Sequence, residues 1–259
     1  MTRDGTEAAE QRPAQTATAP GRLYGVGVGP GDPELITLKA VRVLAGADVV
    51  GWFAKAGNGS NARAAAAAHL RPGVEELPLL YPVTTEIATA DAAYRDAIDR
   101  FYDASAAAVA GHLAAGRTVA VLSEGDPLFY GSYMHIHVRL ADRFEAEVVA
   151  GVTAMSGCWS LAGLPVTQGD DVLTVLPGTL AEAELARRLA GTDAAVVMKI
   201  GRNLAKVRRA LAAAGRLADA VYVERGTTTA GAVHRLADKP GDDAPYFSLV
   251  LVPGWRGRR

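Results

Sequence analysis

Cysteine and net charge are both scarce in this chain, and each shortage excludes a class of protein. Cys158 is the single cysteine among 259 residues, so no internal disulfide can form and a reducing compartment is predicted. Its neighbours include no cluster of His and Cys, so we interpret it as a small, buried apolar residue. The formal net charge is −1, which gives no overall attraction to nucleic acid.

Long apolar runs are also missing. No stretch approaches the roughly 20 apolar residues that a membrane-spanning helix needs, so no membrane partner is expected. Residues 1–20 are rich in Ala, Thr and Gln and contain no apolar signal-peptide core, which predicts a disordered tail on a cytoplasmic protein. A short basic tail is predicted for residues 254–259, where the chain is expected to fray.

What the chain does have is a regular alternation of apolar strands and helices. Nearly half of its residues are apolar (49%), enough to bury one large core or two smaller ones. Strands predicted at 22–28 and 48–53 flank a helix predicted at 34–47, and such a unit requires a parallel sheet. The sequence therefore predicts an α/β fold.

The remaining pattern repeats this alternation after a break. Turn-forming residues at 164–170 predict a boundary between α/β domains at 21–165 and 170–253. Further strands are predicted at 75–80, 118–122, 144–149, 171–176, 194–198, 220–223 and 246–252, with a short hairpin partner at 233–236. Helices are predicted at 58–70, 87–115 (as one helix or two), 132–140, 152–164, 181–190 and 203–214.

The loop at 123–131, with the sequence SEGDPLFYG, lies between a buried strand and a helix. Gly125 and Gly131 permit backbone geometry that other residues resist, and Pro127 stiffens the loop. A second Gly-Asp-Pro loop follows the first strand, at residues 31–33. One such loop is an ordinary turn, but two at the carboxyl ends of parallel strands predict a ligand site, because open α/β sheets bind ligands there.

The glycines do not form a dinucleotide fingerprint. In the two possible frames of G-x-G-x-x-G, the last glycine is replaced by Pro30 or Asp32, and no phosphate loop follows. A nicotinamide oxidoreductase is therefore disfavoured. Asp32 stands where it could cap a helix, and Thr153 stands where its hydroxyl could cap a helix or bind a ligand.

Five blocks of the sequence, in order, closely resemble the tetrapyrrole methyltransferases. They are GVGVGPGDPELITLKA, VLSEGDPLFYGSY, GVTAMSGC, the strand end Met198-Lys199, and the stretch from Val223 to Thr227. The resemblance covers residues 21–253. It implies two α/β domains of the class III S-adenosylmethionine-dependent methyltransferase fold, with the cofactor in the cleft between them and S-adenosylhomocysteine as product. It also implies a homodimer.

Four further blocks are most similar to the branch of the family that methylates precorrin-2 at C20, giving precorrin-3A in cobalamin biosynthesis. They are LPLLYPVTTE, DDVLTVLPGTL, VVMKIGRNLAKVRRAL and APYFSLVLVPG. The alternatives are another ring position, the cobalt-bearing substrate or, in another class, a non-catalytic S-adenosylmethionine-binding protein. The segment 153–159 departs from the serine-rich version of some members, which leaves the metal state of the substrate open.

The resemblance assigns the cofactor contacts motif by motif. The residues implied are Pro30, Glu124, Gly125, Asp126, Phe129, Thr153, Ala154, Met198 and Gly226. Glu124 is a departure, because many siblings carry a small residue there. A contact through its backbone survives that change, and its side chain is free to have a role of its own.

The implied substrate is a large ring with eight carboxylates, which arginine and lysine would bind as charge-assisted pairs. Candidates at predicted strand ends or loops are Lys55, Arg63, Lys199, Arg202 and Arg225. A proton must also leave the methylated carbon, and the candidate bases are Glu124, Glu224, Asp32 and Tyr130. Because the sequence contains no acid–base constellation, the hypothesis at this point is that the ring nitrogens make a protein base dispensable.

Metal is not expected in the chemistry. The nearest pair of ligands is His135 and His137, but residues two apart on a helix do not share a face. Both are interpreted as structural or surface residues.

Overall fold

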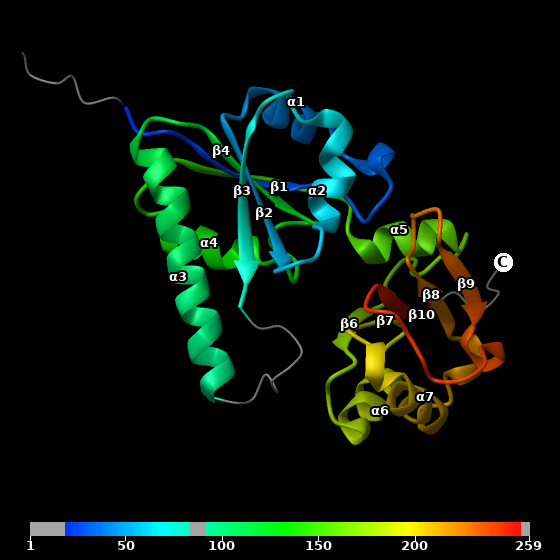
Figure 1. Cartoon of the computed structure of the whole chain (residues 1–259). Helices are drawn as coiled ribbons and strands as arrows, with labels where there is room; N and C mark the ends of the chain where they lie inside the picture. The colour runs from blue at the N-terminus through cyan, green and yellow to red at the C-terminus, as the bar shows by residue number, and fades with distance from the viewer. Residues whose placement is uncertain (1–18, 83–91, 255–259) are drawn as a thin grey trace, which may run out of the picture.

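The computed structural model describes residues 19–82 and 92–254, and these form two α/β domains, each built on its own sheet of five strands (Figure 1). The predicted tail up to residue 18, the segment 83–91 with the start of the predicted helix 87–115, and the basic tail from residue 255 lie outside the described residues. Within the described part of the chain, no helix is both long and apolar enough to cross a membrane.

The first sheet is parallel throughout, as the strand–helix alternation predicts. Its strands follow the order β3-β2-β4-β1-β5. Their bounds are β1 (Leu23–Gly27), β2 (Val49–Lys55), β3 (Glu75–Tyr81), β4 (Val119–Ser123) and β5 (Ala146–Val149). Gly27 of β1 pairs with Ser123 of β4, so the two Gly-Asp-Pro loops leave neighbouring strands at the same edge.

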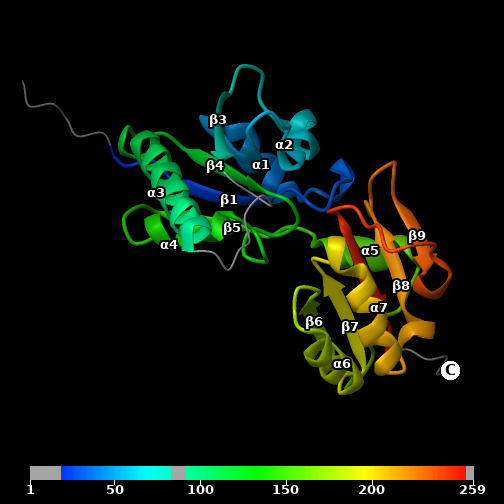
Figure 2. The same cartoon turned by 60° about the horizontal axis from the view of Figure 1, so that its bottom comes forward.

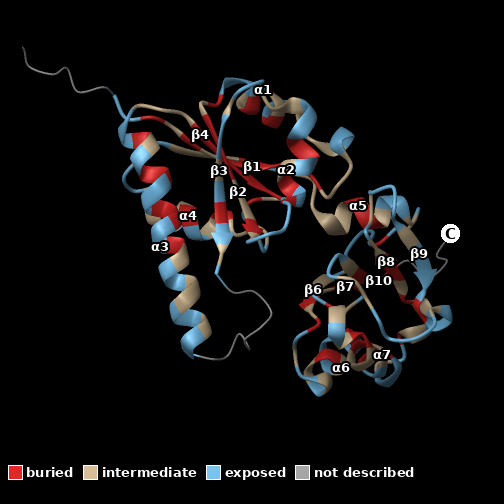
Figure 3. Cartoon of the chain, viewed as in Figure 1, coloured by how far each residue is buried: buried red, intermediate tan, exposed pale blue. Residues whose placement is uncertain are grey.

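Helices cover both faces of this sheet, as Figure 2 shows. On one face lie α1 (Leu38–Gly46) and α2 (Asn61–Ala66), whose alanines and Leu44 pack on the central strands. On the other face lie α3 (Ala92–Ala114) and α4 (Tyr133–Leu140). The buried residues of α3 begin at Tyr102, and the turns before it are not buried (Figure 3).

The second sheet is mixed, with the order β6-β7-β10-β8-β9. Its strands are β6 (Leu173–Pro177), β7 (Ala194–Met198), β8 (Val221–Glu224), β9 (Ala232–Arg235) and β10 (Ser248–Val252). The last strand, β10, lies between β7 and β8 and is antiparallel to both. The start of β10 therefore lies beside the ends of β7 and β8.

Helices also cover both faces of the second sheet. On one face pack α6 (Glu182–Ala190) and α7 (Leu204–Ala213). On the other packs α5 (Ala154–Leu161), through Cys158, Met155 and Trp159. The chain enters α5 directly from β5 of the first sheet, so this helix joins the two domains. The division at residues 165–170 stays a prediction, but the packing groups α5 with the second sheet.

Most predicted elements are confirmed, and the main difference lies after β1. The helix predicted from Glu34 is a 3₁₀ turn, η1 (Pro33–Leu35), followed by α1. Two caps explain the break. The carboxylate of Asp32 accepts a hydrogen bond from the backbone N–H of Glu34, and the hydroxyl of Thr37 accepts one from Ala40. The predicted capping role of Asp32 is confirmed.

Candidate functional site

A cleft of about 570 Å³ lies between the two domains. Its first wall is formed by the loops that follow β1, β4 and β5, and by α2. Its second wall is formed by the ends of β7 and β8 and by residues 246–249 at the start of β10. The topology accounts for this, because the carboxyl ends of the parallel strands face one way and the antiparallel β10 begins where β7 and β8 end.

The loops of the first wall are interlocked backbone against backbone. The N–H of Gly125 donates to the carbonyl of Gly29 at 2.8 Å, and the N–H of Gly151 donates to the Asp126 carboxylate at 3.1 Å. A Cβ added at Gly151 would lie 2.0 Å from the Gly125 carbonyl oxygen and 2.8 Å from the Cα of Gly27. No other residue fits at this position, so the loops after β4 and β5 meet main chain against main chain.

All nine residues that the resemblance implies for the cofactor line this one cleft. Pro30 comes from the first loop, Thr153 and Ala154 from the start of α5, and Met198 and Gly226 from the second domain. The loop after β4 contributes the rest, which are Glu124, Gly125, Asp126 and Phe129. Residues 30 and 226, which are far apart in sequence, thus meet in one cavity.

Two of these side chains already have structural partners. Both carboxylate oxygens of Asp126 accept backbone hydrogen bonds, one from Leu128 at 2.9 Å and one from Gly151 at 3.1 Å. The hydroxyl of Thr153 accepts from the N–H of Ser156 at 3.3 Å and caps α5. These two residues shape the cleft, and their predicted cofactor contacts remain predictions.

Backbone strain is concentrated around the cleft. Among the described residues, the non-glycine residues with positive φ are Tyr130 (56°), Lys199 (55°), Arg225 (45°) and Thr227 (69°). The first three line the cleft, and the hydroxyl of Thr227 accepts a hydrogen bond from the N–H of Asp32 in the other domain at 3.3 Å. Such conformations cost about 1–3 kcal/mol each and persist where the surrounding structure enforces them, typically at functional sites.

Glu124 is the acidic side chain at the end of β4, and solvent reaches it from the cleft. Its carboxylate accepts hydrogen bonds from the side chain of Asn61 and the backbone N–H of Ala62, at the start of α2. Desolvation by the surrounding cleft walls raises the pKa of this carboxyl, and the two hydrogen bonds act in the opposite direction. Both of these donors belong to α2, so this helix of the first domain contributes to the electrostatic setting of Glu124.

The four candidate bases are separated by the structure. Glu124 and Tyr130 line the cleft, whereas Asp32 and Glu224 are not among its lining residues. Asp32 caps η1. The Glu224 carboxylate accepts from the hydroxyl of Tyr222 at 2.6 Å and from the guanidinium of Arg225 at 3.2 Å.

The predicted cationic residues divide in the same way. Lys199 and Arg225 line the cleft and are exposed. The other three lie outside its lining: Lys55 ends β2, Arg202 is exposed on η3 (Gly201–Asn203), and Arg63 pairs with Glu76 at 2.7 Å. Charge at a strand end does not fix the direction in which a side chain points, so the sequence could not make this division.

Sequence reasoning did not assign a site role to several residues that line the cleft, among them Asn61, Tyr246 and Phe247. The rings of Tyr246 and Phe247 pack edge to face, with centroids 5.0 Å apart, and Tyr246 is 82% exposed. Two adjacent aromatic residues just before the last strand were an available signal. Nothing in the sequence marked Asn61, because it stands in an ordinary Ala-rich segment. Among the described residues there is no cluster of three or more His, Cys, Asp or Glu placed to hold a metal ion.

Comparison with known proteins agrees with this architecture. Residues 22–237 match the family described as Tetrapyrrole (Corrin/Porphyrin) Methylases. The chain belongs to the tetrapyrrole methylase family. It is therefore a methyltransferase, as the sequence blocks predict.

Individual tetrapyrrole methylases are similar over nearly the whole chain. A precorrin-2 C(20)-methyltransferase of Sinorhizobium sp. is 70% identical over 238 residues, covering 92% of this chain and 97% of its own. A cobalt-precorrin-2 C(20)-methyltransferase of Salmonella typhimurium is 30% identical and covers 90% and 96%. The crystal structure of uroporphyrin-III C-methyltransferase from Thermus thermophilus, complexed with S-adenyl homocysteine, superposes with a TM-score of 0.62 at 25% identity, covering 90% and 98%.

Proposed function

We propose that this chain transfers a methyl group from S-adenosylmethionine to C20 of precorrin-2, giving precorrin-3A and S-adenosylhomocysteine in cobalamin biosynthesis. One observation carries the proposal: the nine residues implied for the cofactor, which come from both domains, line a single cleft. The similarity to the Sinorhizobium enzyme, at 70% identity, supports this choice of ring position and of a metal-free ring.

The cleft fits the cofactor by size and chemistry. Its volume of about 570 Å³ lies within the roughly 300–1,000 Å³ typical of small-molecule sites. The wall next to the Gly125 backbone is main chain, which allows close approach of a polar ligand, while Ala64, Ala65 and Leu249 give apolar surface. When bound, the cofactor supplies an activated methyl group on a good leaving group, and no metal is needed.

Methyl transfer to carbon requires the reacting atoms in line and about 3–3.5 Å apart. The contribution of the protein is therefore positioning and exclusion of water. The interlocked loops after β1, β4 and β5 are suited to hold a ligand rigidly, and residues 246–249 close the cleft from the second domain. Lys199 and Arg225 are placed to pair with ring carboxylates. We further propose a cytoplasmic homodimer, following the family resemblance.

The test is anaerobic turnover of precorrin-2 with methyl-labelled S-adenosylmethionine, run beside the cobalt-bearing ring, with NMR of the product. We expect label at C20 from the metal-free ring. Label at C20 from the cobalt ring alone would retain the cofactor and the ring position but change the substrate. Label at another carbon would overturn the ring position. Cofactor binding without turnover of either ring would instead favour a non-catalytic binding protein.

A further inference from the structure

The overall reaction replaces a hydrogen on a ring carbon by a methyl group, so a proton must be lost as well as a methyl gained. The new C–CH₃ bond forms as the S–CH₃ bond breaks, and the positive charge passes from sulfur to the ring. Neutrality returns when the C20–H bond breaks, its electron pair returns to the ring, and the proton goes to a base. The sequence offered four candidate bases and did not choose among them.

We propose that the side chain of Glu124 accepts this proton and that Asn61 holds its carboxylate in position. The inference rests on the proposed function. Of the three carboxylates among the candidates, Glu124 alone lines the cleft, because Asp32 caps η1 and Glu224 is held by Tyr222 and Arg225.

Tyr130, the fourth candidate, also lines the cleft, but its chemistry is less suited. A phenolic hydroxyl already carries a proton and is a weaker proton acceptor than a carboxylate oxygen. In addition, the ammonium of Lys199 lies 4.4 Å from the centroid of the Tyr130 ring, which gives Tyr130 a different partner. A carboxylate is ionised and ready to accept a proton.

The setting of Glu124 meets the geometric requirements of a general base. Its side chain stands in the cleft, beside the backbone of Gly125, and the donors that act on it, the side chain of Asn61 and the backbone N–H of Ala62, both lie on α2. The desolvation that raises its pKa also makes the carboxylate a stronger base than an ordinary surface glutamate. The hydrogen bonds from Asn61 and Ala62 favour the charged form that can accept a proton. A small residue at this position would leave the loop intact and remove the base.

The experiment compares Glu124→Gln with wild type on whichever ring the wild type methylates. General-base loss costs about 10²–10⁴-fold in rate, so we expect kcat to fall by about that factor, with cofactor affinity by calorimetry unchanged within a few-fold. The variant should also show a normal primary isotope effect with deuterium at C20, because proton loss becomes rate-limiting. The matched control is Glu145→Gln, an exposed carboxylate paired with Arg22 before β5, at the edge of the sheet away from the cleft.

The outcomes separate the roles. Unchanged kcat in Glu124→Gln would overturn the proposal and favour the ring nitrogens as the sole proton acceptors. A Glu124→Gln variant that loses cofactor affinity but regains the wild-type kcat at saturating cofactor would also overturn the proposal. In that case Glu124 would bind the ammonium group of the cofactor instead of accepting the proton. A wild type that methylates no ring would overturn the proposed function and this inference together. An active wild type whose kcat equals that of Glu124→Gln would overturn the inference alone.

Asn61 is tested as a positioning residue by a double-mutant cycle. Asn61→Ala should lower kcat less than Glu124→Gln does, since the carboxylate remains but loses one donor. The double variant should be no slower than Glu124→Gln alone, because Asn61 acts only through Glu124. Additive losses would contradict this coupling and assign Asn61 a role of its own.

Discussion

The side-chain ammonium of Lys199 lies 4.4 Å from the centroid of the Tyr130 ring. The two residues belong to different domains, both line the cleft, and both have a positive φ, of 55° and 56°. A cation over an aromatic face contributes about 0.5–1 kcal/mol at an exposed site, which is weak enough for a stronger partner to replace it. A ring carboxylate is such a partner, so we expect Lys199 to exchange the Tyr130 ring for a carboxylate of the bound substrate.

Replacing Lys199 with methionine keeps the length of the side chain and removes its charge. A charge-assisted hydrogen bond contributes about 1.5–3 kcal/mol, so we expect the KM for the tetrapyrrole to rise by about 10–100-fold. Cofactor affinity should stay within a few-fold of wild type. Steady-state kinetics and calorimetry check the two expectations, with Lys206→Met on α7 as the matched control. An unchanged KM would remove Lys199 from the substrate site.

Gly151→Ala tests the interlocked loops. The added Cβ would lie 2.0 Å from the Gly125 carbonyl oxygen, so the loop after β4 must shift. Overpacking of this kind costs about 1–3 kcal/mol of unfolding free energy, and because Gly125 lines the cleft, displacing its loop should also weaken cofactor binding. The control is Gly111→Ala in α3, where a Cβ meets nothing within 4 Å and a gain of about 0.5–1 kcal/mol is expected. Urea unfolding measures both, and equal effects would contradict the steric argument.

The strands and the glycine loops could be predicted because their signals are local. A buried apolar run between Gly-rich turns specifies a strand, and two Gly-Asp-Pro loops on neighbouring strands converge once the sheet is parallel. The five blocks shared with the family then located Pro30 and Gly226 on opposite walls of one cleft, as the structure has them.

What could not be predicted depends on contacts between distant segments. The insertion of β10 between β7 and β8, which brings Tyr246 to the cleft, follows from sheet pairing that periodicity does not encode. The packing of α5 on the second sheet likewise depends on tertiary contacts that the local sequence does not reveal. Asn61, at the start of α2, interacts with the side chain of Glu124, which follows β4, and local sequence does not show that these two segments meet.

Cys158 should be inert in the folded protein. Burial raises the pKa of its thiol to about 12, so only about one thiol in ten thousand is ionised at pH 8, and the thiolate is the reactive species. We expect no alkylation by iodoacetamide over an hour at pH 8, and full alkylation in guanidinium, as measured by mass spectrometry. Rapid modification of the native chain would instead mean that the reagent reaches the thiol through the cleft, because Cys158 is among the cleft-lining residues.

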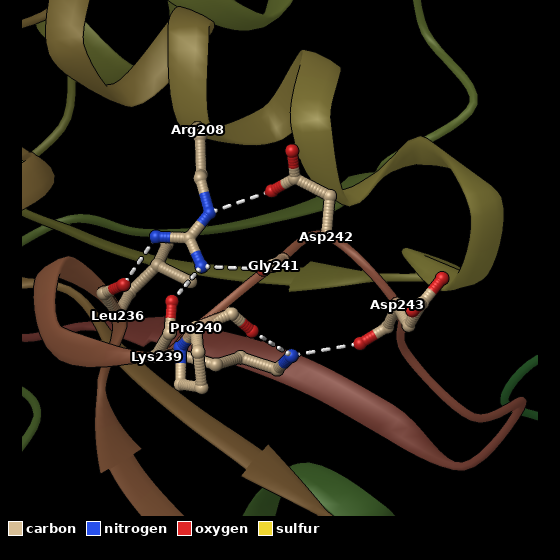
Figure 4. Close-up of polar contacts among 7 residues, drawn as sticks. All are labelled: Arg208, Leu236, Lys239, Pro240, Gly241, Asp242 and Asp243. Carbon is tan, nitrogen blue, oxygen red and sulfur yellow. Dashed lines mark hydrogen bonds and ion pairs between the residues drawn. The ribbon is translucent and has the colours of Figure 1, made fainter.

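Arg208 fixes the loop that leads to Tyr246 and Phe247. Its guanidinium donates to the carbonyls of Leu236, Lys239 (2.7 Å) and Gly241 (3.0 Å) and pairs with Asp242 at 2.8 Å (Figure 4).

Arg208→Met would leave these backbone acceptors without their donor, so we expect a loss of about 1–3 kcal/mol in unfolding free energy, measured by urea titration. Tyr246 begins the second wall of the cleft three residues beyond Asp243, so a loosened loop should also raise the KM for the tetrapyrrole more than it weakens cofactor binding. The neighbouring Arg209→Met is the matched control, because the side chain of Arg209 is 61% exposed and pairs with the half-buried Glu182, so the unfolding midpoint should not move. Equal losses in the two variants would mean that helix charge, rather than the loop carbonyls, accounts for the effect.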